Sequence, residues 1–263
     1  MSDIGNQLYQ RTQESKNSLF LQGELAQLTY LSYEETVKRI NNGQEEEIEL
    51  SYPVGYRPDK SVIPSTKKDK RDELINRYVY LGENQLPINF IYQLVTILET
   101  TLGDLLRIVL KKFPNKIGSK RTIKSSIVLS ATSIDEIHEK TIDSVLNEMA
   151  YKSPKDYAAD FQSLASVNLL ECPAFHKYIE TKATRDIYIH NNGIANEIYV
   201  SKSGTHARVI SGQPLPLTNV YFLESFEATL QIIEWLQKQL HDIWHSTVYE
   251  NYLQRSTSAQ QGA

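Results

Sequence analysis

The chain has 263 residues, of which 40% are hydrophobic and 23% charged, and it carries a net charge of −4 with an isoelectric point near 5.9. This composition is typical of a globular protein with a hydrophobic core, and it excludes a protein that coats nucleic acid by bulk electrostatic attraction, so any nucleic-acid contact must use a local basic patch. The single cysteine, Cys172, excludes an internal disulfide and the cysteine-pair type of zinc site.

The N-terminal sequence bears on localisation. Its first residues, MSDIGNQLYQRTQESK, lack the basic and then apolar run of a secretory signal. No window of the chain approaches the roughly 18 uninterrupted apolar residues of a membrane span. We therefore expect a soluble cytoplasmic protein without a membrane partner.

The first third of the chain begins with a predicted helix over residues 15–40, where apolar side chains recur at mostly helical spacing and an Asn-Asn-Gly stop follows. Residues 43–70 then combine an acidic run, several prolines and a charged KKDKRDE run. This mixture is typical of a long surface excursion, with a short extended pair around residues 48–54. We assign residues 1–85 to this helix and excursion, which are either part of the main bundle or appended to it.

The segment from Leu86 to Phe113 is the most apolar in the chain, and it predicts a helix inside a bundle, with a proline in its first turn and another at its end. Glu99 and Asp104 interrupt its apolar surface. Because a carboxylate on a buried helix needs a partner, we expect both to face cations on neighbouring helices. Arg107 is an alternative local partner for Asp104.

Further helices are expected towards the C-terminus. Ser133 and Glu136 have the spacing of a capping box, which predicts a helix running to about Met149. A shorter helix over residues 155–168 follows an SPKD turn signal, and Pro173 begins the helix that contains RDIYIH.

A long amphipathic helix is predicted from residue 219 to about residue 252. Convincing strands are few, so the predicted fold class is all-α, a helical bundle over residues 86–253 with a long N-terminal insertion. The polar tail, residues 254–263, is expected to be disordered.

The stretch RDIYIHNNG contains the most informative pattern. Arg185 and His190 are separated by four residues, with Asp186 directly after the arginine. This R-x4-H pattern, its HNNG continuation, the apolar helix ending in ETTLGDLLRIVLKKFP and the later IDEIHEKTIDSVLNEMAYKSPKDY resemble the HEPN superfamily, and within it the RiboL-PSP-like branch. The resemblance covers roughly residues 86–250.

The resemblance implies a HEPN-type helical bundle that forms a homodimer, in which two motifs meet in a composite active site. It also implies an endoribonuclease that cleaves RNA without a metal or other cofactor. In biological terms it implies the effector of a toxin-antitoxin or anti-phage system, with an antitoxin or regulatory protein as a further partner.

The chemistry of RNA cleavage suits these residue types. Attack of the 2′-hydroxyl on the adjacent phosphate needs proton transfer, which His190 can provide near neutral pH, and a cation for the transition state, which Arg185 can provide as a planar fork. The products are a 2′,3′-cyclic phosphate and a 5′-hydroxyl. Asp186 or Asn191 would fix the imidazole tautomer or hold the arginine, and Glu99 would either brace Arg185 or form a structural salt bridge.

Helix geometry separates the two motif residues. At about 100° per residue, positions five apart lie roughly 140° from each other, so Arg185 and His190 point in different directions. One subunit is therefore expected to supply half of a site that a twofold partner completes.

Other polar residues carry weaker predictions. The stretch KKFPNKIGSKRTIK could hold an RNA backbone or simply form a solvated helix end; its candidate residues are Lys111, Lys112, Lys120 and Arg121. No metal site is predicted, because no histidine has a cysteine partner. His241 and His245 are one helical turn apart but show no evident third ligand, so we interpret them as surface or packing residues.

Two alternatives to an enzyme remain open. Arg185 beside Asp186 is also typical of a solvated ion pair, and His190 before Asn-Asn-Gly is typical of a helix C-terminus. The chain would then be a non-catalytic HEPN module that binds RNA, a nucleotide or a partner protein. A second alternative is a scaffold whose residues 43–70 dock another chain.

Overall fold

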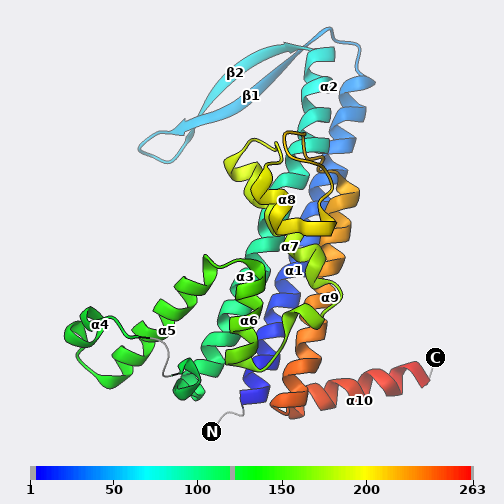
Figure 1. Ribbon diagram of the computed structural model, residues 1–263. Helices are drawn as coiled ribbons and strands as arrows, with labels where there is room; N and C mark the ends of the chain where they lie inside the picture. Colours follow the sequence, from blue (N-terminus) through cyan, green and yellow to red (C-terminus); the bar gives the residue numbers. More distant parts are fainter. Residues whose placement is uncertain (1–3, 119–121, 262–263) are drawn as a thin grey trace.

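A computed structural model describes residues 4–118 and 122–261, and it is mainly helical with one small sheet (Figure 1). The first part comprises α1 (Ile4–Asn41), β1 (Glu47–Tyr56), β2 (Val62–Lys70), α2 (Arg71–Tyr80), the π-helix η1 (Leu81–Gln85) and α3 (Leu86–Lys112). The second part comprises η2 (Pro114–Ile117), α4 (Ser125–Ser130), α5 (Ile134–Ala150), α6 (Pro154–Ala165), η3 (Leu169–Glu171), α7 (Phe175–His190), α8 (Glu197–Ser203), η4 (Gly204–His206), α9 (Asn219–Ile243) and α10 (Thr247–Gln261).

The central helix is α3, as its apolar sequence predicted. It packs against α1, α5, α7 and α9, and its side chains at Leu98, Leu105 and Leu106 are fully buried. It begins at Leu86 with a proline in the first turn and ends before Pro114. Even so, among the described residues no helix is both long enough and apolar enough to cross a membrane.

The carboxylates of α3 have cationic partners on other helices, as predicted. Asp104 accepts a hydrogen bond of 2.8 Å from Nε of Arg11 on α1, and Glu99 pairs with two cations of α7. Arg107 instead lies 2.6 Å from Asp143 on α5, so the alternative local pair with Asp104 is not formed.

Residues 43–70 differ from the predicted loop-like excursion, because most of them form an antiparallel hairpin that projects from the bundle (Figure 1). Pro53 lies opposite Pro64, and a bulge follows between Pro53 and Gly55. In a two-stranded sheet both strands are edge strands. A proline is tolerated there when its nitrogen faces solvent, because no hydrogen bond between the strands is lost. The strand pair is therefore longer than the sequence indicated, in spite of the prolines.

The N-terminal helix α1 shares the core of α3 and α9. It begins at Ile4, well before the predicted start, and Leu8 and Leu19 are fully buried in the main hydrophobic cluster. Beyond the hairpin, α2, η1 and α3 follow one another without a break, so residues 71–112 form one long helical rod (Figure 1).

The C-terminal helices begin where the sequence predicted, but the last one is divided. Ser133 Oγ accepts the N–H of Glu136 at 3.1 Å, the first bond of the predicted capping box. The predicted single helix to about residue 252 is wrong, since α9 ends at Ile243 and the chain turns.

Helix α10 then occupies the tail that was expected to be disordered, and it extends away from the bundle (Figure 1). Ser246 Oγ accepts the N–H of Tyr249, and Asn6 of α1 accepts the N–H of Val248, so both side chains cap its start. Its Gln and Ala residues favour a helix once the first turn is held. Of the tail, residues 262–263 lie outside the described part.

Candidate active site on α7

Helix α7 carries the R-x4-H motif and packs against α3, α8 and α9. Thr184 and Ile187 face the interior, with 0% and 4% of their surface exposed, while Arg185 is partly exposed and His190 is exposed. The buried face of α7 therefore anchors the helix in the core, while Arg185 and His190 stay accessible to solvent.

The predicted helix stop after His190 is confirmed. Asn192 and Gly193 have positive φ angles of 48° and 77°, and the N–H of Gly193 donates to the carbonyl of Ile187. Glycine suits this left-handed position because a side chain there is strained. His190 is therefore the last residue of α7.

Arg185 is held by carboxylates on both sides. Its Nη2 donates to both carboxylate oxygens of Glu99, at 3.1 and 3.2 Å, and its Nε lies 3.0 Å from Oδ1 of Asp186. The Nε–H is not aligned with that oxygen, and the buried Nε has no hydrogen-bond partner. No carboxylate among the described residues pairs with Nη1. The guanidinium is thus oriented by its neighbours while one amino group stays available.

These contacts belong to a longer row of alternating charges, here called the charge row: Lys182, Glu99, Arg185, Asp186 and Lys202. Lys182 Nζ lies 2.6 Å from Glu99, and Lys202 Nζ lies 3.2 Å from Asp186. With three cations and two carboxylates, the row has a net charge of +1. The row is thus slightly positive, although the chain as a whole carries a net charge of −4.

The His190 side chain has no hydrogen bond or ion pair with any residue that the structure describes. Its position five residues after Arg185 turns the two side chains roughly 140° apart on a regular helix. Of the two residues considered for orienting the site, Asp186 lies beside Arg185, whereas the amide of Asn191 donates to the carbonyl of Ile194. Asp186 therefore holds the arginine, and Asn191 braces the turn.

No protein-family model, curated protein or solved structure matches this chain.

The basic stretch after α3 does not join the charge row within one chain. Lys111 pairs with Glu139 of α5 at 2.8 Å and Lys112 is exposed, while Lys120 and Arg121 lie outside the described residues. Along a helix that rises 1.5 Å per residue, Lys111 is about 18 Å from Glu99. Helix α7 runs antiparallel to α3, so His190 lies in the opposite direction.

A cavity of about 200 Å³ lies between α3, α5, α6 and α7, with Glu99 and Lys182 of the charge row in its lining. Burial, reinforced by the charge of Glu99, raises the pKa of the Tyr157 and Tyr178 hydroxyls, so both stay protonated. Nucleotide-sized ligands usually occupy pockets of about 300 Å³ or more. The cavity can therefore hold water or a small polar molecule rather than a nucleotide.

The sequence reading missed a buried polar network on the inner face of α7. Glu180 is only 2% exposed, and it accepts hydrogen bonds from Thr184, Tyr199, Tyr221 and Arg208 at 2.7 to 2.9 Å. Arg208 also stacks on the Tyr221 ring at 3.8 Å. The sequence held one indication that Glu180 is buried. It lies at helical spacing from Ala183, Thr184 and Ile187, which form the buried face of α7.

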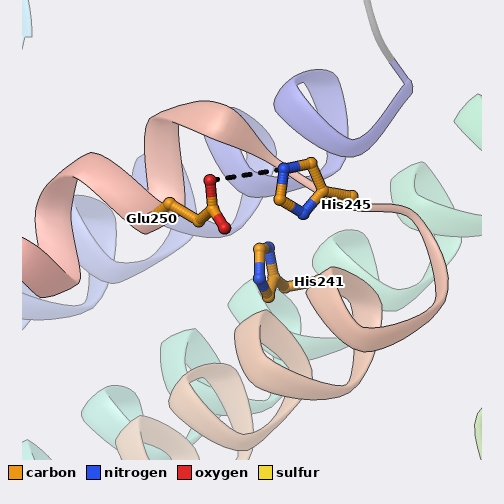
Figure 2. Close-up of side chains that lie close together, drawn as sticks. All are labelled: His241, His245 and Glu250. Atoms are coloured by element: carbon orange, nitrogen blue, oxygen red, sulfur yellow. Dashed lines mark ion pairs between the residues drawn. The ribbon is translucent and has the colours of Figure 1, made fainter.

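A carboxylate beside the histidine pair was also missed. Figure 2 shows that His241, His245 and Glu250 converge at the corner between α9 and α10. No third partner for the two histidines was evident from the sequence, and the structure places the Glu250 carboxylate beside them. The single helix expected there would have kept Glu250 on a continuous axis, whereas the turn at residues 244–246 brings it back.

Proposed function

We propose that this protein is a metal-independent endoribonuclease of the HEPN type that acts as a homodimer. The observation that carries the proposal is the pairing, on one helix, of an arginine oriented by Glu99 with an exposed and unpartnered His190 at the helix end. An oriented cation and an accessible imidazole are what phosphodiester cleavage without a metal requires.

The proposed reaction uses Arg185 and the His190 residues of both copies. The 2′-hydroxyl attacks the adjacent phosphorus and loses its proton to one His190. The bond from phosphorus to the 5′-oxygen then breaks, and that oxygen takes a proton from the His190 of the second copy. Arg185 binds the phosphate through Nη1 and stabilises the added charge. The products are a 2′,3′-cyclic phosphate and a 5′-hydroxyl.

The surface around His190 supports a second copy at this face. Three isoleucines flank it in the chain, and Ile189, Ile194 and Ile198 are 48%, 38% and 63% exposed. Exposed apolar side chains near a polar site are typical of an interface. A twofold partner placed here would bring a second motif to the same phosphate, which one chain cannot supply.

The decisive experiment incubates total RNA with the protein in EDTA and maps the fragment ends. We expect cleavage by the wild type with cyclic-phosphate ends, and none by His190→Ala or Arg185→Ala. His138→Ala is the matched control, because it removes an exposed histidine from α5. Undiminished cleavage by His190→Ala would contradict the mechanism.

The proposed role as a toxin or anti-phage effector predicts that expression of the wild type arrests growth. His190→Ala should relieve the arrest at equal protein level, and a cognate antitoxin would be recovered as a partner that restores growth. Growth arrest by both the wild type and His190→Ala would show that toxicity does not come from RNA cleavage, which would contradict this role.

A non-catalytic RNA-binding module is the second candidate, favoured by the two carboxylates beside Arg185, which are typical of a structural ion pair. In that case RNA would be retained but not cut. His190→Ala would then leave RNA affinity unchanged, which gel-shift measurements would show.

A further inference from the structure

The corner between α9 and α10 gathers two imidazoles and a carboxylate (Figure 2). One ligand atom from each of His241, His245 and Glu250 can be chosen so that all lie within 4.8 Å of one another. Within residues 4–118 and 122–261 this is the one group of its kind. We propose that the corner binds a divalent transition-metal ion, with Zn²⁺ as the best fit.

The local sequence explains why the three side chains meet. His241 lies in the last turn of α9, and His245 lies in the turn just beyond the helix end at Ile243, with its ring 5.0 Å from that of His241. The chain then turns at Ser246, and Glu250 follows one turn into α10. Asn6 of α1 accepts hydrogen bonds from Ser246 Oγ and from the N–H of Val248, at 2.8 and 3.2 Å. The turn is thus fixed from outside, which preorganises the ligands.

The donor set matches the preferences of zinc. Two imidazole nitrogens and one carboxylate oxygen make a three-ligand site whose fourth position is left for water. Bonds of about 2.0–2.1 Å would place tetrahedral ligand atoms roughly 3.4 Å apart. The side chains of His245 and Glu250 are 57% and 46% exposed, so both can rotate to close the remaining distance.

Two contacts compete with the metal. Nε2 of His245 lies 3.3 Å from Oε2 of Glu250, a pair that a bound ion would replace (Figure 2). Nδ1 of His241 accepts the N–H of Ser246 at 3.0 Å, so a neutral His241 carries its proton on Nε2. Coordination through Nε2 would need the other tautomer, and coordination through Nδ1 would displace the N–H. Either route gives up a hydrogen bond at the start of α10. Metal binding is therefore coupled to the attachment of α10 to the bundle.

The chain contains a matched comparison for this site. His176 and His206 stack at 5.3 Å, but no carboxylate joins them in a group of three ligands within the described residues. If any neighbouring pair of histidines sufficed, the two pairs would bind metal equally. The proposal requires the corner alone to bind, through the added carboxylate of Glu250.

The test uses full-length protein without an affinity tag, titrated with Zn²⁺ by calorimetry and with Co²⁺ by visible absorption. We expect about one equivalent per chain, as for other sites with three protein ligands. Glu250→Gln and His245→Asn should weaken binding by at least tenfold, and His176→Asn should not. Circular dichroism of each variant checks the fold. Absence of binding by the wild type, or equal binding by Glu250→Gln, would overturn the site.

A second readout follows α10 directly. Zn²⁺ should slow tryptic cleavage at Arg255 in the wild type and leave the rate in Glu250→Gln unchanged. Only in the wild type would the metal link α10 to the end of α9. Equal protection of both proteins would contradict the proposal. RNA cleavage in EDTA does not depend on this corner, so failure of either proposal leaves the other intact.

Discussion

Replacement of Glu180 by alanine should reveal how strongly α7 depends on its buried network. The change removes four hydrogen bonds and leaves the Arg208 guanidinium facing a cavity without its carboxylate. Breaking one side of a buried ion pair costs about 3–5 kcal/mol. The Arg208 side chain is 22% exposed and can turn toward solvent, so we expect the lower end, about 3 kcal/mol. That loss corresponds to a fall in Tm of roughly 6–12 °C.

Urea denaturation followed by circular dichroism measures the change in the free energy of unfolding. Glu224→Ala is the matched control, because that glutamate pairs with Lys177 on the surface and should matter by less than about 1 kcal/mol. The double variant lacking both Glu180 and Arg208 should lose less than the sum of the single losses. A loss below about 1 kcal/mol in Glu180→Ala would refute the reasoning from burial.

Three further predictions concern other parts of the chain. Gly5→Ala should lower the free energy of unfolding by about 1–3 kcal/mol in a urea titration, because the added Cβ would overlap the Trp244 and His245 carbonyls. Gly103→Ala should raise it by about 0.5–1 kcal/mol, because the space beside Gly103 is open. Ile198→Lys should shift the sedimentation of a dimer toward the monomer, and Leu129→Lys, at an 86% exposed residue of α4, should not; equal shifts would remove the proposed interface. Arg77 and then Lys67 hold the pKa of Asp69 at about 2, below its ordinary 3.8, so the stabilisation that these ion pairs give the hairpin is complete above pH 3.8 and lost as the pH falls through about 2. Pepsin should therefore cleave the wild-type hairpin increasingly faster between pH 4 and pH 2, relative to Asp69→Asn; a constant ratio would contradict this account.

Three predictions that rest on local pattern agree with the structure. The apolar run of α3, the cap at Ser133 and the stop after His190 each depend on residues within a few positions. Arg185 was expected as a partner of Glu99 and lies beside it, whereas Arg11 was not foreseen as the partner of Asp104, because a carboxylate on a buried helix requires a cation without indicating which helix supplies it.

Features that depend on distant residues could not be read from the sequence. Glu180 meets Arg208 and Tyr221 only because the segment after α8 folds back on α7 and α9. Glu250 joins the histidines because Asn6, more than 240 positions earlier, helps to set the direction of α10. Periodicity describes one helix at a time, so it places side chains on faces but not against each other.

The packing of α1 against α9 has a consequence for biosynthesis. Asn6 bonds to Ser246, 240 positions away, and Leu8 and Leu19 share a core with α9. At about 5–20 residues per second, a ribosome needs roughly 10–40 seconds between the two helices. Throughout that interval the apolar side of α1 lacks its last cover, and α7 lacks the helix behind it. A nascent chain therefore exposes the apolar side of α1, and α7 stays incompletely packed, until α9 has been synthesised.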